Sequence, residues 1–261
     1  MHAKRLATAA ILVPVFYLYI TKLSAVWFDG LVIVMGLLAI WEFLSFYGSP
    51  REMRLAGMGL CLLMLAPAAF AGHPWPGIFA IVLIVPVALR LFAGGPKGAL
   101  ADLSAPVLGL LYIPGLLLYQ IFLRGIGAHW IIFLYGTVWI GDSFALYVGQ
   151  SVGKRKLYPE VSPNKTVEGA AGSVIGGAAA GFAASLVFHL GISSGAAVLL
   201  GALMGIITII GDLVESMFKR DAEVKDSSDV FPGHGGMLDK LDGPLISAPV
   251  LYWFLLRLLR I

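Results

Sequence analysis

Two aspartates stand three residues apart in a glycine-rich stretch near the C-terminus, FPGHGGMLDKLDG (residues 231–243). Carboxylates as close as Asp239 and Asp242 repel each other, so a divalent cation is their natural partner, and ligation by oxygen alone favours Mg²⁺. Gly235 and Gly236 allow a tight backbone turn with exposed amides, which predicts a cradle for a phosphate group. The stretch therefore has the residue types of a magnesium and phosphate site.

Two further aspartates lie inside apolar runs, Asp142 in VWIGDSFALYVG and Asp212 in ITIIGDLVESMFKR. A carboxylate at the centre of a membrane helix costs about 2.5–3.5 kcal/mol, so such an acid is a candidate functional residue. The alternative is that both lie near the ends of their helices and reach solvent. After Asp212, the residues Glu215, Ser216 and Lys219 share one helix face. That face suits a metal-bound phosphate, although a solvated stripe at a helix end is an open alternative.

A basic loop, VGKRKLYPEVSPNKTVEG (residues 152–169), precedes the last apolar segments. Pro159 and Pro163 favour an extended, non-helical path. Positive charge alone is a weak signal, because membrane topology already requires it on one side. The polar and rigid cluster Ser162–Thr166 has no such explanation. We therefore predict that this cluster helps to bind an anionic substrate, with Lys165 as its principal cation.

Other kinds of site are less well supported. His234 fits two interpretations, a ligand-binding residue or a structural hydrogen-bonding residue. Cys61, the single cysteine, lies in an apolar run and is expected to behave as a small apolar residue. The sequence has no zinc-binding Cys/His spacing, no Walker P-loop and no G-x-S-x-G elbow.

The elements that must position these residues are long apolar segments. Hydrophobic residues make up 59% of the 261 residues and charged residues 13%, against about 25% charged in an average soluble domain. Many apolar runs reach the roughly 17–25 residues that a helix needs to cross a bilayer. We therefore expect an all-α, polytopic membrane bundle with about nine spans. These are Ala7–Ile20, Val26–Tyr47, Leu55–Gly72, Gly77–Ala93, Ala105–Leu123, His129–Gly149, Val167–Gly191, Ser194–Val214 and Pro244–Ile261.

The basic residues indicate how the bundle is oriented. If the N-terminus lies in the cytoplasm, 14 of the 18 Lys and Arg residues fall on the cytoplasmic side and 4 on the other, as the positive-inside rule predicts. The first span follows MHAKR without a clear cleavage site, so we expect an uncleaved anchor. The basic loops suit anionic lipid or phosphate, and no nucleic-acid-binding module accompanies them.

Acidic residues are concentrated in the second half of the chain. Four of the fifteen precede residue 142, namely Asp29, Glu42, Glu52 and Asp102. We therefore expect residues 1–125 to form a transmembrane scaffold and residues 126–261 to form the catalytic region of a single membrane domain.

The stretch SMFKRDAEVKDSSDVFPGHGGMLDKLD, Ser216–Asp242, closely resembles the signature of the phosphatidate cytidylyltransferases, or CDP-diacylglycerol synthases. The one departure is Lys240, where the family usually has Arg, so the charge is kept but the two-pronged guanidinium contact is lost. The resemblance extends back through GDSFALYVGQSVGK and LYPEVSPNKTVEG and is strong over residues 141–243. The matching residues are Ser216, Lys219, Arg220, Lys225, Asp226, Ser228, Pro232, His234, Gly235, Gly236, Asp239 and Asp242.

The resemblance implies transfer of a cytidylyl group from CTP to phosphatidic acid, which forms CDP-diacylglycerol and pyrophosphate and requires Mg²⁺. With the patterns above, it assigns catalytic roles to Asp212, Lys219, Arg220, Asp239 and Asp242, of which Asp212, Asp239 and Asp242 are the expected metal ligands. The expected substrate-binding residues are Asp142, Lys154, Ser162, Lys165, Thr166, Ser216, Lys225, His234, Gly235, Gly236 and Lys240. The expected setting is a bacterial inner membrane, with membrane lipids around the bundle and the active site on the cytoplasmic side. The oligomeric state is left open, with a homodimer among the alternatives.

Two rival functions use similar residues. A transporter would also place acids within its membrane helices, but its polar residues should line a path to the far side. A CTP-dependent lipid kinase would transfer the γ-phosphoryl group and release CDP instead of pyrophosphate. The acids and bases here cluster on one expected face, and the motif is specific, so both rivals are less favoured.

Overall fold

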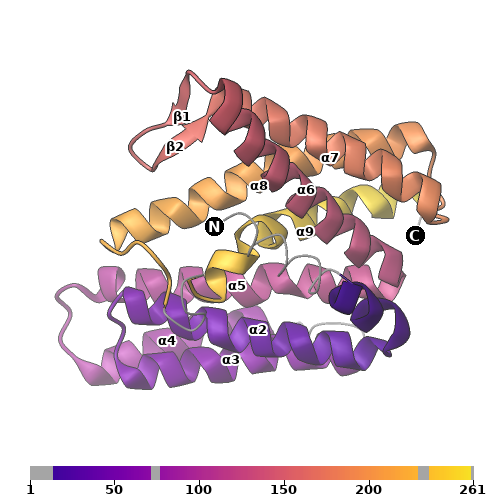
Figure 1. Cartoon of the computed structure of the whole chain (residues 1–261). Coiled ribbons are helices and arrows are strands. Elements are labelled where there is room, and N and C mark those ends of the chain that lie inside the picture. The colour runs from indigo at the N-terminus through magenta and orange to yellow at the C-terminus, as the bar shows by residue number, and fades with distance from the viewer. Residues whose placement is uncertain (1–13, 72–76, 229–234, 260–261) are drawn as a thin grey trace.

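The structure, a computed structural model, describes residues 14–71, 77–228 and 235–259. These residues form helices α2 to α9, one β-hairpin and a further helical stretch over residues 14–22 (Figure 1). The helices are α2 (Ala25–Phe46), α3 (Arg51–Ala71), α4 (Ile78–Ala93), α5 (Ala99–Ile126), α6 (Ala128–Val152), α7 (Val167–Val187), α8 (Ser194–Asp221) and α9 (Leu238–Leu258), and the strands are β1 (Lys156–Tyr158) and β2 (Ser162–Thr166).

Six of these helices, α2, α3, α5, α6, α7 and α8, are long and apolar enough to cross a bilayer. The predicted all-α polytopic fold is therefore confirmed, and the chain is an integral membrane protein. The count of nine spans is not confirmed. Helix α4 has only 16 residues, α9 is not among the six helices, and the expected span Ala7–Ile20 lies mostly outside the described residues.

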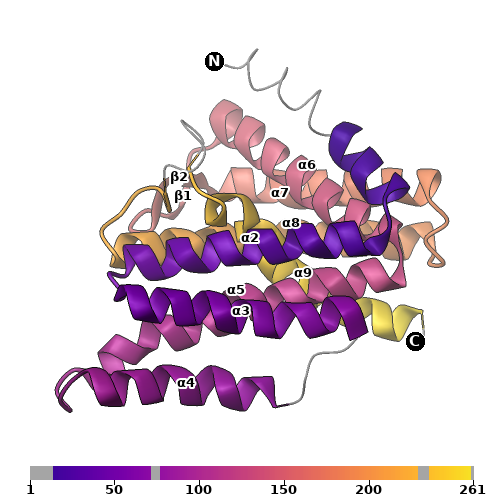
Figure 2. The same ribbon diagram turned by 90° about the horizontal axis from the view of Figure 1, so that it is seen from below.

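The helices form two groups with α9 between them. Helix α7 packs on both α6 and α8, while α2, α3 and α5 pack on one another. Helix α4 lies against α3 and α5, and Figure 2 shows it at the outer edge of that group. Helix α9 contacts α6 and α8 on one side and α2 and α5 on the other (Figure 1). The helix that carries Asp239 and Asp242 is therefore held by both halves of the chain.

Helices α7 and α8 touch backbone to backbone because glycines line their contact. A Cβ atom added to Gly177 would meet the carbonyl oxygen of Gly201, and one added to Gly201 would meet that of Gly177. Gly181 and Gly205 lie equally close to the opposite backbone. Small residues at an interface let membrane helices approach closely. This contact fixes α8, and with it Asp212, against α7.

The loop between α6 and α7 is a short antiparallel hairpin, in agreement with the extended path expected from its prolines. Tyr158 pairs with Ser162, and Lys156 pairs with Thr166. The Thr166 hydroxyl oxygen then accepts a hydrogen bond from the Gly169 N–H (3.0 Å) and caps α7. The strand β2 therefore leads directly into a membrane helix, which fixes the position of the SPNKT cluster.

The polar loops gather at one end of the bundle (Figure 1). Tyr47, after α2, donates a hydrogen bond to Asp221 at the end of α8 (3.0 Å). Arg220 donates to the carbonyl oxygen of Val161 in the hairpin (3.4 Å). At the opposite end, Arg124 donates to the carbonyl oxygen of Leu23 (3.3 Å). The hairpin, the end of α8 and the end of α2 are therefore neighbours in space.

Candidate active site

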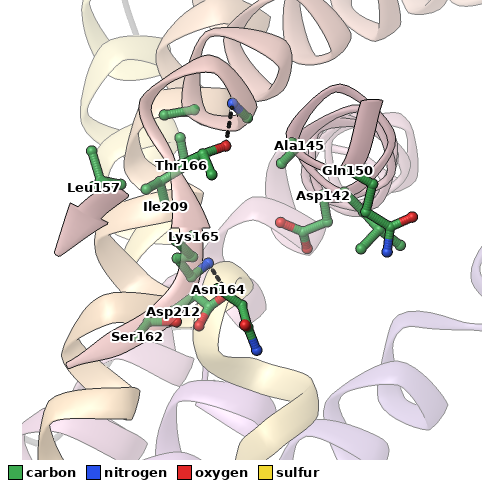
Figure 3. Close-up of a pocket in the computed structure, with 14 residues that line it drawn as sticks. Asp142, Ala145, Gln150, Leu157, Ser162, Asn164, Lys165, Thr166, Ile209 and Asp212 are labelled. Atoms are coloured by element: carbon green, nitrogen blue, oxygen red, sulfur yellow. Dashed lines mark hydrogen bonds and ion pairs between the residues drawn. The ribbon is translucent and has the colours of Figure 1, made fainter. Parts of the chain in front are cut away.

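A cavity of about 650 Å³ opens at the polar end of the bundle, between α6, the hairpin, α7 and α8 (Figure 3). It brings together two of the three sequence regions that were predicted to carry chemistry, the apolar runs with their aspartates and the SPNKT cluster. Its polar lining residues are Asp142, Gln150, Ser162, Asn164, Lys165, Thr166 and Asp212.

Lys165 and Asp212 form an ion pair on the floor of this cavity. Their side chains are about a quarter and a third exposed, at 24% and 34%, so both can still meet a ligand. Ser216, one turn further along α8, donates a hydrogen bond to the other oxygen of Asp212 (3.3 Å). Asp142 faces the pair from α6 across the cavity (Figure 3). Lys165 is the basic residue that lines the cavity within the described part of the chain.

Asp242 adds a third carboxylate from α9. Its negative charge is repelled by the charges of Asp212 and Asp142. The positive charges of Lys165 and Lys219 oppose that repulsion. Helix α9 approaches α8 closely here, because a Cβ atom on Gly211 would meet the backbone carbonyl oxygen of Asp242. The cavity therefore lies beside a cluster in which carboxylates outnumber the lysines that face them.

Asp239 lies in a separate cluster with different partners. Its Oδ1 atom accepts a hydrogen bond from Lys219 Nζ (2.6 Å), which also lies 3.1 Å from the buried carboxylate of Glu215. Its Oδ2 atom accepts from the Ser227 N–H (3.0 Å), the Ser227 hydroxyl (2.7 Å) and the Gly236 N–H (2.7 Å). Asp239 therefore faces donors of the protein itself.

The charge state of Asp239 follows from these partners. Asp239 precedes the apolar part of α9, and its partial burial by itself would raise the pKa of the carboxyl group. The hydrogen bonds from Lys219, Gly236 and Ser227 outweigh that effect and hold the pKa below its ordinary value. Asp239 is therefore ionised at neutral pH.

The adjacent glycines of the HGG segment pack against carboxylates. Gly235 has a positive φ of 77°, and a Cβ atom there would meet the carboxylate of Asp239. A Cβ atom on Gly236 would meet the Ser227 hydroxyl and the carboxylate of Glu42, a residue of α2. The Gly236 amide, which was expected to face a phosphate, donates to Asp239 in this structure. The small residues are needed to admit two acidic side chains.

The remaining predicted residues divide into two sets. Ser162 and Thr166 line the cavity with Lys165, and Arg220 holds the hairpin through the carbonyl oxygen of Val161. Exposed basic residues that do not line the cavity form the second set, namely Lys154, Lys225 and Lys240. His234 lies outside the described residues.

Several residues at the site were not predicted from sequence. Asn164 and Gln150 line the cavity, and Tyr112 of α5 interacts electrostatically with Asp242 and Glu215. Glu42 and Ser227 meet beside Asp239. Asn164 belongs to the predicted cluster Ser162–Thr166, although it was not named individually as a binding residue. Glu42 and Tyr112 carry no comparable signal, since each is a single polar residue in an apolar run.

The residues of the cavity fit the chemistry of Mg²⁺. The carboxylates of Asp142, Asp212 and Asp242 carry more negative charge than Lys165 balances. Among the described residues, no three His, Cys, Asp or Glu side chains are arranged to hold a metal ion by themselves. Mg²⁺ is usually held by one or two carboxylates, with water and substrate phosphates as its other ligands. An acidic cluster that stays incomplete without substrate suits that manner of binding.

The structure defines a class of protein: an α-helical membrane bundle with a site of carboxylates and a lysine at one end. The chain matches the model of the Cytidylyltransferase family over residues 3–258. It is 32% identical over 265 residues to the phosphatidate cytidylyltransferase of Bacillus subtilis. The matched region covers 97% of this chain and 97% of the relative. It is also 32% identical over 262 residues to that of Synechocystis sp., covering 89% of this chain and 88% of the relative. The chain therefore belongs to the cytidylyltransferase family.

Proposed function

We propose that this protein transfers the cytidylyl group of CTP to phosphatidic acid and releases pyrophosphate. The family match over nearly the whole chain carries this proposal, together with the names of relatives at 32% identity. The structure supports it through the cavity, where Lys165 and an excess of carboxylates meet at one end of a membrane bundle.

The reaction asks the protein mainly for positioning and charge neutralisation. An oxygen of the lipid phosphate attacks the α-phosphorus of CTP, and the bond from that phosphorus to the oxygen bridging the β-phosphate breaks. The lipid phosphate is anionic at neutral pH, so no strong general base is needed. Lys165 is placed to neutralise phosphate charge, and Ser162 and Asn164 beside it can donate hydrogen bonds to the same group.

Asp142, Asp212 and Asp242 are the residues that would hold Mg²⁺. When bound, the ion supplies positive charge to the phosphates of CTP and to the departing pyrophosphate. The expected role of Asp239 as a direct ligand is the less favoured part of the metal assignment, because its two oxygens already accept four hydrogen bonds. We assign Asp239 to holding Lys219 and the loop before α9.

The cavity is open to both substrates, to CTP from water and to phosphatidic acid from the bilayer. Leu146 of α6 lines the cavity and is 43% exposed, so an apolar outer surface continues into the polar site. A lipid can therefore enter sideways while CTP enters from water. We place this end in the cytoplasm of a bacterial inner membrane, because the basic loops gather there and the relatives are bacterial.

The test is an assay of the purified protein with CTP, phosphatidic acid and Mg²⁺. Cytidylyl transfer gives CDP-diacylglycerol and one pyrophosphate for each CTP consumed. A lipid kinase would instead give CDP and a lipid pyrophosphate, and either product would contradict the proposal. Transport of a substrate into vesicles without turnover would support a transporter.

A further inference from the structure

Glu42 is a buried carboxylate outside the cavity, in the half of the chain that was expected to be scaffold. It lies near the polar end of α2 and is only 2% exposed. Among the described residues, its hydrogen-bond partners lie 185 to 196 residues later in the chain. They are the Ser228 hydroxyl (2.7 Å), the Met237 N–H (2.9 Å), the Leu238 N–H (2.9 Å) and the Ser227 hydroxyl (3.0 Å).

Two of these donors are backbone amides at the start of α9. The first N–H groups of a helix have no partner within it, and a negative charge near them is stabilising. Met237, which precedes α9, provides no side-chain cap of its own. Glu42 therefore caps α9 from another helix and fixes where it begins.

The same carboxylate is linked to the two aspartates of the first turns of α9. The Ser227 hydroxyl lies between Glu42 and Asp239, at 3.0 and 2.7 Å, and Asp239 binds Lys219 at 2.6 Å. Asp242 follows one turn later on α9, where it joins the acidic cluster beside the cavity. The start of α9 therefore sets the positions of both aspartates relative to α8.

We propose that Glu42 is a positioning residue, which acts on the reaction by holding the start of α9 and the Ser227–Ser228 segment in register with α8. It does not touch the cavity. Its effect passes through Asp239 and Asp242. The inference rests on the proposed cytidylyl transfer for its kinetic test, but the contact itself can be tested without turnover.

Glu42→Gln is the sharpest variant, because it keeps the shape of the side chain. Each carboxylate oxygen faces one backbone N–H and one hydroxyl: Met237 and Ser228 at Oε1, Leu238 and Ser227 at Oε2. Whichever way the amide is turned, its NH₂ group therefore opposes a backbone donor. Asp29→Asn is the matched control, since Asp29 is a buried acid of the same helix, 5% exposed, that the proposal gives no role.

The experiment measures kcat, the KM for CTP and amide hydrogen exchange at Met237 and Leu238 in both variants. Glu42→Gln should lower kcat by about ten- to a hundredfold, the usual loss when an outer-shell partner is removed. The KM for CTP should change much less, because Lys165 and the cavity are left intact. Exchange at the two amides should become faster. Asp29→Asn should behave as the wild type in kcat and exchange.

Wild-type kcat and exchange in Glu42→Gln would overturn the inference. If Glu42→Gln does not fold, Ser228→Ala takes its place, because it removes one donor and leaves the carboxylate. It should give a smaller loss of kcat and faster exchange at Met237. Wild-type values for both would also overturn the inference. If the wild type shows no cytidylyl transfer, the proposed function fails, and the exchange comparison alone then decides the role of Glu42.

Discussion

Among the residues of the cavity, Lys165 is the one to which we assign the most direct part in substrate binding. Lys165→Ala should lower kcat/KM by about ten- to a hundredfold, since a hydrogen bond to a charged group contributes about 1.5–3 kcal/mol. Lys156 is the matched control, because it belongs to the same hairpin but is exposed and does not line the cavity. Steady-state kinetics on both variants checks this. Equally small losses of kcat/KM in both variants would mean that the positive charges of the hairpin serve only to orient the protein in the membrane.

Asp239→Asn separates a metal ligand from a positioning residue. The amide would oppose a donor in either orientation, because Lys219 lies on one oxygen and Ser227 and Gly236 lie on the other. We expect turnover to be nearly lost in a folded protein, with the Mg²⁺ concentration for half-maximal activity unchanged in what remains. A titration of activity against Mg²⁺ measures this. A large increase in the Mg²⁺ concentration for half-maximal activity would instead identify Asp239 as a metal ligand.

At the residue scale, the sequence predicts the residues that line the cavity better than the residues that hold them in place. Asp142, Asp212 and Lys165 could be found because charge within an apolar run, or beside two prolines, is unusual. Glu42 was assigned to the scaffold, because the acidic residues are concentrated in the second half of the chain. Its importance comes from Ser227 and later residues, and only tertiary structure brings them together.

The contact between α7 and α8 is the element-scale feature that fixes Asp212. Gly177→Ala should lower stability by about 1–3 kcal/mol, the usual cost of overpacking a close contact, because the added carbon would meet the carbonyl oxygen of Gly201. Gly136→Ala in α6 is the control, since nothing lies within 4 Å of its added Cβ atom. Thermal unfolding in detergent should show a lower Tm for the first variant alone. Equal Tm values would contradict the packing.

The elements differ in how far sequence determines them. Hydropathy predicts the long helices well because a bilayer requires backbone hydrogen bonds to be satisfied within each span. It locates the ends less well, since α8 continues to Asp221, seven residues beyond the expected end at Val214. The polar turns of α8 lie outside the apolar run but carry Ser216 and Lys219. Only their contacts with Asp212 and Asp239 show why the helix continues.

On the scale of the whole molecule, the gathering of polar loops predicts a single labelling pattern. In a Cys61→Ala background, Glu160→Cys in the hairpin and Asp226→Cys after α8 are both exposed positions. An impermeant thiol reagent should reach both only when the cytoplasmic face is accessible. Ser193→Cys, which precedes α8 at the other end, should show the opposite pattern. Labelling of residues 160 and 226 from opposite faces would contradict one common site.

The partners of Glu42 also impose an order in time. The chain is made from its N-terminus, so Glu42 is synthesised 185 residues before Ser227. At about 5–20 residues per second, that interval is roughly ten to forty seconds. Throughout it, the carboxylate of Glu42 lacks the four donors that later surround it. A nascent protein that stops short of Ser227 therefore keeps this acid near the membrane surface without the four donors that hold it in the finished fold.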